Sequence, residues 1–158
     1  DGARRFGMIM SFNAIVVLLF TTFLSHITRH HHPLRTLAAA GLLYAAGFGM
    51  MGWFTTMPLF FAAAFLWTFG EIFMVTNESV FVASHTPYNH RGRFTSISGF
   101  FGWGGAVIGP VISGAIIEQI GTQSLMRIMP ALGAVVAACF LLLRRFDTRG
   151  QRQQRTRR

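Results

Sequence analysis

Residues 59–83 read LFFAAAFLWTFGEIFMVTNESVFVA, an apolar run of 25 residues that contains only two acids. An α-helix rises 1.5 Å per residue, so about 20 residues cross the roughly 30 Å hydrocarbon core of a bilayer. The run does not alternate between apolar and polar residues, as a strand of a membrane barrel would. We therefore expect this segment to be a transmembrane helix.

Four further apolar runs of similar length accompany this one. The five predicted transmembrane helices cover residues 7–25, 36–54, 59–83, 96–117 and 125–143. Pro33, Pro58 and Pro87 fall at or beside predicted helix ends, where a missing N–H is tolerated best. The pattern predicts an all-α membrane protein, with a five-helix bundle over residues 1–143 and a basic tail over residues 144–158.

The composition of the chain agrees with a membrane protein. Of its 158 residues, 52% are hydrophobic and 12% are charged, about half the charged share of a typical soluble domain. The net charge of +9 comes from arginines that lie between and after the apolar runs. Nucleic-acid binding needs a basic face on a folded domain, so we expect no nucleic-acid partner.

The 14 arginines are divided unequally between the two sides of the predicted bundle. Eleven lie on the side that carries residues 26–35, 84–93 and 144–158, and three lie on the other side. The positive-inside rule then predicts a cytoplasmic C-terminus and an outside N-terminus in the cell membrane. Because the chain starts with Asp and enters a helix at once, we expect it to be the later part of a longer polytopic protein.

Two acids lie within the predicted helix at residues 59–83. Glu71 is near its middle, and Glu78 lies two turns further on the same face. Ionisable groups in a membrane are costly and mark functional sites, and a buried carboxylate can exchange protons near neutral pH. Glu71 and Glu78 are therefore candidates for proton coupling or substrate binding. The alternatives are a structural acid at Glu71 and an ion pair of Glu78 with Arg91 or Arg93.

Asparagines and tryptophans supply the other polar groups at depth. Asn13 and Asn77 can either hydrogen-bond a substrate or tie two helices together, which is the commoner use. Trp67 and Trp103 lie deeper than Trp53 and are candidates to line a pocket for apolar cations. The alternative for both tryptophans is packing or contact with lipid.

Small residues recur along the predicted helix at residues 96–117. They are Gly99, Gly102, Gly105, Gly109, Ser113 and Gly114. Small residues let a neighbouring helix approach closely, and Pro110 removes a backbone hydrogen bond and allows a bend. We expect helix packing at Gly105, Gly109 and Gly114 with a hinge at Pro110. A homodimer seam is the alternative, although it leaves Pro110 unexplained.

The histidines do not predict a metal site. His26 and the run from His30 to His32 lie in one loop with no Cys or carboxylate nearby in sequence, and adjacent histidines diverge. We expect no metal and no cofactor, and the absence of a nucleophile motif or phosphate loop argues against an enzyme. The arginine tail is expected to contact anionic membrane lipid.

One part of the chain resembles a known family. Gly70, Glu71, Asn77 and residues 83–94 (ASHTPYNHRGRF) resemble the tenth helix and following cytoplasmic loop of bacterial major facilitator superfamily transporters. The similarity is strongest to the proton-coupled multidrug efflux branch, the drug:proton antiporters. The best motif is Pro-x-x-x-Arg-Gly-Arg, which is formed by Pro87, Arg91, Gly92 and Arg93.

The rest of the chain resembles the same family in the expected order. Residues 105–114 (GAVIGPVISG) are similar to the eleventh helix and to the antiporter glycine-proline motif. Residues 13–19 (NAIVVLL) resemble the eighth helix, and residues 33–35 resemble the entry to the ninth. The resemblance implies transmembrane helices eight to twelve, a partial C-terminal half of the fold.

The resemblance also implies a function, alternating-access efflux of drugs or lipophilic compounds against protons. Arg91 and Arg93 would brace a cytoplasmic gate, and Gly105, Gly109 and Pro110 would pack and bend a helix. The partners implied are lipid, a small-molecule substrate, protons and the missing N-terminal half. A carrier for one specific metabolite, or a small non-transporting membrane protein assembling through its Gly-rich helix, are the alternatives.

The chain also departs from the family pattern at the gate. Thr76 stands where relatives often have Pro, and Ser84, Tyr88 and Asn89 stand where relatives have acids. These departures leave the family's usual charge network at this gate incomplete.

Overall fold

The computed structural model describes residues 2–155, with side chains described for residues 2–148. Its elements are α1 (Gly2–Thr28), α2 (Pro33–Trp53), α3 (Met57–His85), the 3-10 helix η1 (Tyr88–His90), α4 (Arg91–Ile120) and α5 (Thr122–Arg155). Five of the helices are long and apolar enough to cross a membrane, and residues 2–155 contain no strand. The predicted all-α membrane fold with five transmembrane helices is confirmed.

Each helix is longer than the apolar run that predicts it, because helices end at backbone signals and not where hydropathy falls. Pro33 begins α2, with His32 as its N-cap. Thr86 is extended before Pro87 and ends α3, as the residue before a proline favours. Gly121, with a φ of 80°, separates α4 from α5 in a conformation that favours glycine. Helix α5 then runs on to Arg155, through residues that lie beyond the apolar run.

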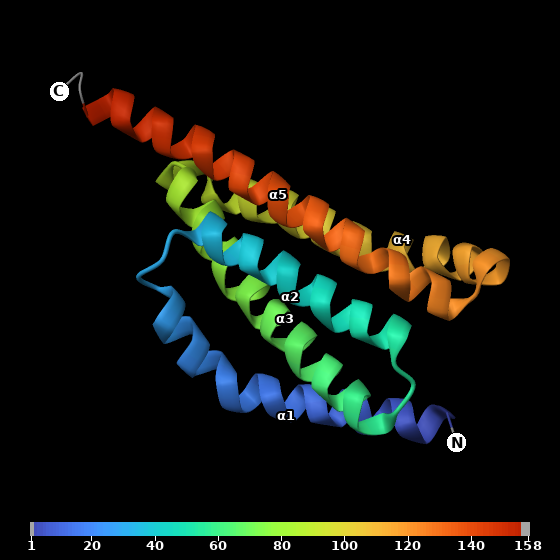
Figure 1. Ribbon diagram of the computed structural model, residues 1–158. Helices are drawn as coiled ribbons and strands as arrows, with labels where there is room; N and C mark the ends of the chain where they lie inside the picture. The colour runs from blue at the N-terminus through green and yellow to red at the C-terminus, as the bar shows by residue number, and fades with distance from the viewer. Residues whose placement is uncertain (1, 156–158) are drawn as a thin grey trace.

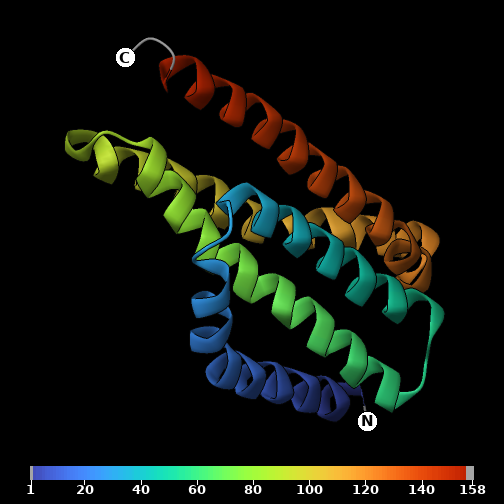
Figure 2. The same cartoon turned by 60° about the vertical axis from the view of Figure 1, so that its left-hand side comes forward.

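Helix α2 is the centre of the bundle. It packs extensively against α3 on one side and α5 on the other, while α1 covers the far side of α3 (Figure 1). Helix α4 makes few contacts, with α3 and α5, and none of its residues is buried. The rotated view in Figure 2 shows the same order, with α2 between α3 and α5.

Helix α1 is bent partway along its length in both views (Figures 1 and 2). The Thr21 hydroxyl donates a hydrogen bond of 2.5 Å to the carbonyl of Val17. Such a bond from Thr to the preceding turn competes with the helix ladder and bends helices. The bend gives the two halves of α1 different directions.

Glycines allow the close contact between α2 and α5. A Cβ at Gly49 would lie 2.6 Å from Cγ of Pro130, and one at Gly133 would lie 2.7 Å from the Ala45 Cβ. A Cβ at Gly41 would lie 3.2 Å from the Gly133 carbonyl oxygen. These distances are shorter than van der Waals contact, so a side chain at these positions would force the two helices apart.

Glycines also allow the close contact between α2 and α3. A Cβ at Gly47 would lie 2.9 Å from the Trp67 Cβ and 2.9 Å from the Ala63 carbonyl oxygen. A Cβ at Gly70, on α3, would lie 3.0 Å from the Ala40 carbonyl oxygen. Helix α2 is therefore held by glycine contacts on both of its packed sides.

The glycines of α4 are in a different position. A Cβ at Gly105, Gly109 or Gly114 would meet nothing within 4 Å. The packing predicted for these residues is therefore not made by the part of the chain that the structure describes. That packing stays a prediction about partners outside the described residues. The hinge at Pro110 also stays a prediction, since Pro110 lies inside the continuous helix α4.

Candidate functional site

A polar cluster joins α1 to α3, and Asn13, Thr68 and Glu71 form it. The Asn13 Nδ2 donates to the Thr68 Oγ1 at 2.8 Å and to the Glu71 Oε2 at 3.1 Å. The fully buried Thr68 hydroxyl donates in turn to the Ala64 carbonyl at 2.6 Å. We call these three residues the Asn13 cluster, and a single amide holds both α3 side chains in it.

The sequence positions this cluster through helix periodicity. Thr68 and Glu71 are three residues apart, so their side chains lie on the same face of α3. Gly70, beside Glu71, lets α2 approach so closely that a Cβ there would lie 3.2 Å from the Tyr44 ring. The Tyr44 ring therefore lies against the residue of α3 that precedes Glu71. The site therefore draws on three helices.

In the described residues, the donor beside the Glu71 carboxylate is the neutral Asn13 amide and not a basic side chain. Among residues 2–148, no arginine or histidine forms an ion pair with Glu71. The Glu71 side chain is half-buried, and the side-chain donor that holds it in the described residues is the Asn13 amide and not a guanidinium. Chemically, this carboxylate can bind either a proton or a cation.

Aromatic rings continue from this carboxylate along the α2–α3 seam. The Tyr44 and Phe48 rings are stacked with centroids 5.9 Å apart, and the Phe48 and Trp67 centroids are 5.7 Å apart. Trp67 precedes Glu71 by one turn of α3, and its buried Nε1 has no hydrogen-bond partner in the described part of the chain. Trp67 also packs on Gly47, which is the packing alternative, and its use in lining a pocket stays a prediction.

The structure does not bring Trp103 to the Asn13 cluster. Trp103 lies on α4 and is 77% exposed. Helix α4 contacts α3 and α5 but packs on neither α1 nor α2. A role for Trp103 in the same pocket as Trp67 would therefore require a movement of α4, and its contribution stays a prediction.

Glu78 joins α3 to α4. The Ser98 hydroxyl donates to the Glu78 Oε1 at 2.5 Å. The two residues line a cavity of about 250 Å³ between the helices, together with Val75, Ser79, Val82, Thr95 and Gly99. Within residues 2–148, Glu78 forms no ion pair with Arg91 or Arg93. Because α4 begins at Arg91, Ser98 stands two turns into the helix and faces Glu78 instead.

Asn77 serves its own helix. It is buried, and its Nδ2 donates to the Phe73 carbonyl at 3.0 Å and to the Thr76 Oγ1 at 3.1 Å. Both acceptors lie on α3, so within the described residues the Asn77 amide donates to no second helix. It also lines a cavity of about 500 Å³, with Arg29 and His31 near the end of α1.

The Pro-x-x-x-Arg-Gly-Arg motif forms the turn between α3 and α4. The His90 N–H donates to the Pro87 carbonyl at 2.9 Å, which closes η1, and Arg91, Gly92 and Arg93 open α4. The Arg91 guanidinium carbon lies 5.4 Å from the centroid of the Tyr88 ring. This distance is typical of a cation–π contact between Arg91 and Tyr88.

No metal centre accompanies these clusters in the described part of the chain. There, no group of three His, Cys, Asp or Glu side chains is arranged to hold a metal ion. The described chemistry is therefore that of carboxylates, amides, hydroxyls and aromatic rings.

Comparison with known proteins identifies the family. Residues 2–158 match the family model described as Major Facilitator Superfamily. The chain belongs to this superfamily. It is 22% identical over 135 residues to the uncharacterized MFS-type transporter YqjV of Bacillus subtilis (strain 168), which covers 85% of this chain. The chain spans about a third of the length of this relative, 33%. No solved structure matches it significantly.

Membership of the Major Facilitator Superfamily gives the polar clusters their context. The family and the five apolar helices together indicate a multi-pass membrane protein that belongs to a superfamily of secondary transporters. In such carriers, sites lie near the bilayer midplane, and polar groups at that depth mark them. The Asn13 cluster fits this description through Glu71.

Sequence reasoning missed Tyr44, Phe48 and Ser98. Tyr44 is the one tyrosine inside an apolar run, so the logic that selected Asn13 would also have selected it. Phe48 is one of 17 phenylalanines and carries no signal of its own. Ser98 could not be found, because its partner depends on how α4 lies against α3.

Proposed function

We propose that this chain is part of the C-terminal half of a carrier that exchanges protons for lipophilic cations by alternating access. Its five helices would correspond to family helices eight to twelve. The observation that carries the proposal is the Glu71 carboxylate, which an Asn13 amide orients and no described basic side chain neutralises.

A carboxylate of this kind can couple two ligands. A proton and a cationic substrate both bind the ionised form, so each displaces the other from the same group. Such competition lets an inward proton gradient expel a cation, provided that the two forms favour different conformations. Asn13 links the state of Glu71 to the position of α1, which packs chiefly on α3.

The rings beside Glu71 support a lipophilic substrate. Tyr44, Phe48 and Trp67 offer aromatic faces along the seam that ends at the carboxylate. Aromatic faces attract organic cations, and a buried indole N–H without an acceptor can donate to a substrate. A cation with an apolar body would use both features.

The remaining parts of the proposal follow from the family. The arginine distribution supports a cytoplasmic C-terminus, which would place Pro87, Arg91, Gly92 and Arg93 at the cytoplasmic gate. Sites in this family lie between two halves, so this chain would supply one wall and an N-terminal half the other. The open glycine face of α4, at Gly105, Gly109 and Gly114, is available to such a partner.

The decisive experiment compares Glu71→Gln with wild type in the intact transporter, reconstituted in proteoliposomes. The readout is pH-gradient-driven transport of ethidium, a planar lipophilic cation. Gln keeps an acceptor for Asn13 but cannot take up a proton, so we expect driven transport to be abolished. Glu118→Gln, at an exposed acid of α4, is the matched control and should transport normally.

Two results would contradict the proposal. Proton-driven transport that survives in Glu71→Gln would remove Glu71 as the coupling acid. A substrate panel in which wild type carries one narrow solute and no lipophilic cation would instead identify a carrier for a specific metabolite.

A further inference from the structure

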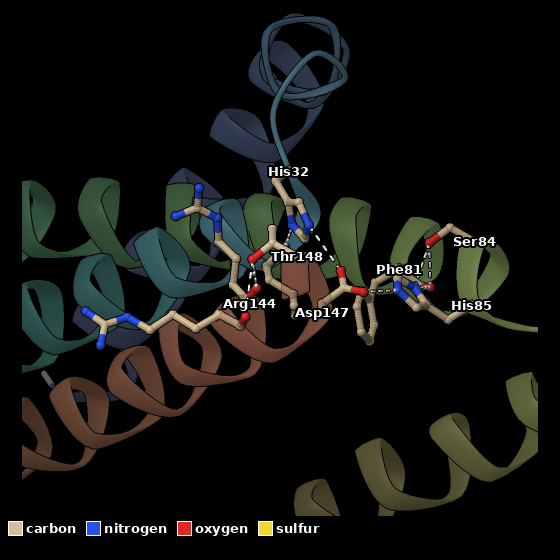
Figure 3. A network of polar contacts seen from close by, with 9 residues as sticks. His32, Phe81, Ser84, His85, Arg144, Asp147 and Thr148 are labelled. Carbon is tan, nitrogen blue, oxygen red and sulfur yellow. Dashed lines mark hydrogen bonds and ion pairs between the residues drawn. The ribbon is translucent and has the colours of Figure 1, made fainter. Parts of the chain in front are cut away.

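A single carboxylate joins the ends of three helical segments. The Asp147 Oδ2 on α5 lies 3.1 Å from the His32 Nε2, and the Asp147 Oδ1 lies 3.1 Å from the His85 Nε2 (Figure 3). His32 caps the start of α2, and His85 is the last residue of α3. The Asp147 side chain is only 17% exposed. We call these three residues the Asp147 bridge.

The hydrogen bonds of His32 require a neutral ring. The Leu34 N–H donates to the His32 Nδ1 at 3.3 Å, so that nitrogen acts as an acceptor and carries no proton. The proton must then be on Nε2, which faces the Asp147 carboxylate. A second proton on His32 would remove the acceptor that caps α2, whose first turn includes the buried Leu34.

The contacts of His85 differ from those of His32, because they fit a charged ring. Its Nδ1 lies 3.0 Å from the Phe81 carbonyl oxygen, and its Nε2 lies 3.1 Å from the Asp147 Oδ1. Both partners are acceptors only, so both contacts are hydrogen bonds only when each ring nitrogen carries a proton. The contacts of His85 are therefore complete in the imidazolium form, paired with the Asp147 carboxylate.

Ser84 offers an alternative for the neutral ring. Its Oγ lies 2.8 Å from the Phe81 carbonyl and 2.9 Å from the His85 Nδ1. The single hydroxyl proton can serve the carbonyl when His85 is charged, and it can turn to Nδ1 when His85 is neutral. The neutral state keeps a bond within α3 but loses the charge that reinforces the contact with α5.

We infer that the Asp147 bridge is a proton-operated clamp, which holds the end of α3 to α5 through an ion pair when His85 is charged and through a weaker, neutral hydrogen bond when His85 is uncharged. Helices α3 and α5 pack on opposite sides of α2, so the bridge reaches around the end of α2 to join them (Figures 1 and 3). Because α3 continues through η1 into α4, weakening of this contact would loosen the turn that leads to α4.

Other charged and titratable groups surround this end of the bundle. Among residues 2–148 they are Arg29, His30, His31 and Arg35 around the α1–α2 connection and the start of α2, His90 and Arg91 around η1, and Arg144 and Arg145 on α5. The arginines keep their charge at every pH of interest. Among the histidines, His31 contacts the Ile27 carbonyl and His30 accepts from Arg29, so both act within their own segment. Histidine side chains ordinarily change charge between about pH 5 and 8.

The test is hydrogen–deuterium exchange of the intact protein in lipid nanodiscs, from pH 5.5 to 8.5, corrected for the intrinsic pH dependence of exchange. In wild type, we expect peptides covering residues 81–90 to exchange about fivefold more slowly at the acidic end, because the charged contact is stronger. His85→Gln keeps a neutral donor but cannot gain charge, so its exchange should not change with pH.

Three further variants separate the clamp from a merely structural role. His32→Gln should keep the pH dependence, because the inference assigns the change of charge to His85, and His90→Gln is the matched control with the same expectation. Asp147→Asn should exchange rapidly at every pH. The inference is overturned if His85→Gln keeps the wild-type pH dependence, or if His32→Gln loses it as completely as His85→Gln.

Discussion

The Asn13 side-chain amide on α1 donates to the Glu71 carboxylate on α3 across 3.1 Å. The same amide donates to Thr68, so two polar side chains of α3 depend on one residue of α1. Helix α1 packs chiefly on α3, and few other contacts hold it in the described chain. The position of α1 and the state of Glu71 are therefore linked through Asn13.

Replacing Asn13 with Leu, a side chain of similar size, should uncouple the position of α1 from the state of Glu71. The change leaves the buried Thr68 and the Glu71 carboxylate without their amide donor, which typically costs about 1–3 kcal/mol. We expect proton-driven transport by the intact protein to fall at least about tenfold, the rate change that 1.4 kcal/mol produces.

The control for this change is Gln119→Leu, at an exposed position near the end of α4. It should transport at the wild-type rate. An Asn13→Leu variant that transports normally would show that Glu71 does not need its donor.

The glycine contacts of α2 predict opposite effects for two Gly→Ala variants. A Cβ at Gly49 would lie 2.6 Å from the Pro130 ring, which cannot rotate away, so Gly49→Ala should destabilise the protein by about 1–3 kcal/mol. Gly105→Ala meets nothing in the described chain, so the contacts of this chain alone predict a neutral effect or a stabilisation of up to about 1 kcal/mol.

The difference is measured as the midpoint of thermal unfolding of each variant in the same detergent. Size-exclusion chromatography detects the protein that remains folded. If Gly105→Ala lowers the midpoint as much as Gly49→Ala does, the face of α4 is packed against a part of the transporter outside this chain. An unchanged midpoint in Gly49→Ala would contradict the tight α2–α5 contact.

Ser98→Ala should loosen the start of α4. It removes the hydroxyl that donates to Glu78 across the α3–α4 cavity, and α4 has no buried residue to compensate. We expect faster hydrogen–deuterium exchange over residues 91–105. Ser113→Ala is the matched control, because the Ser113 hydroxyl bonds only within α4 in the described chain. Equal exchange in both variants would argue against the Ser98–Glu78 link.

Arg127→Lys should weaken the other end of the bundle. The Arg127 Nε donates to the Gly52 carbonyl in the last turn of α2 at 3.1 Å, and its guanidinium carbon lies 5.1 Å from the Trp53 ring centroid. Lys keeps the charge but loses the planar group that makes both contacts. We expect a loss of about 1 kcal/mol in thermal unfolding, whereas the exposed Arg145→Lys should be neutral.

The sequence could predict the helices and part of the site. Five long apolar runs are sufficient for the fold class, and the cost of polar groups in lipid selected Asn13 and Glu71 without knowledge of their contact. Hydropathy could not place helix ends, because the helix ladder continues into polar surroundings until Pro87 or Gly121 stops it.

The packing of the glycines could not be predicted in the same way. Gly41, Gly49 and Gly133 carry close contacts, while Gly105 and Gly109 of the more conspicuous pattern carry none in the described chain. Small residues permit an approach, but which helices are neighbours decides whether it happens. The Asp147 bridge could not be predicted either, because Asp147 is more than sixty residues from His85 in sequence.

The glycine contacts on both sides of α2 also bear on how this protein can evolve. Helix α2 is confined on two faces, so few replacements of its glycines are tolerated. This holds although α2 contains no Asp or Glu and no arginine that takes part in the polar clusters. The unburied α4 is free of that restraint within this chain. We expect natural variation among close relatives to be lowest at Gly41, Gly47 and Gly49, so that the least variable helix is the one that holds the others in place.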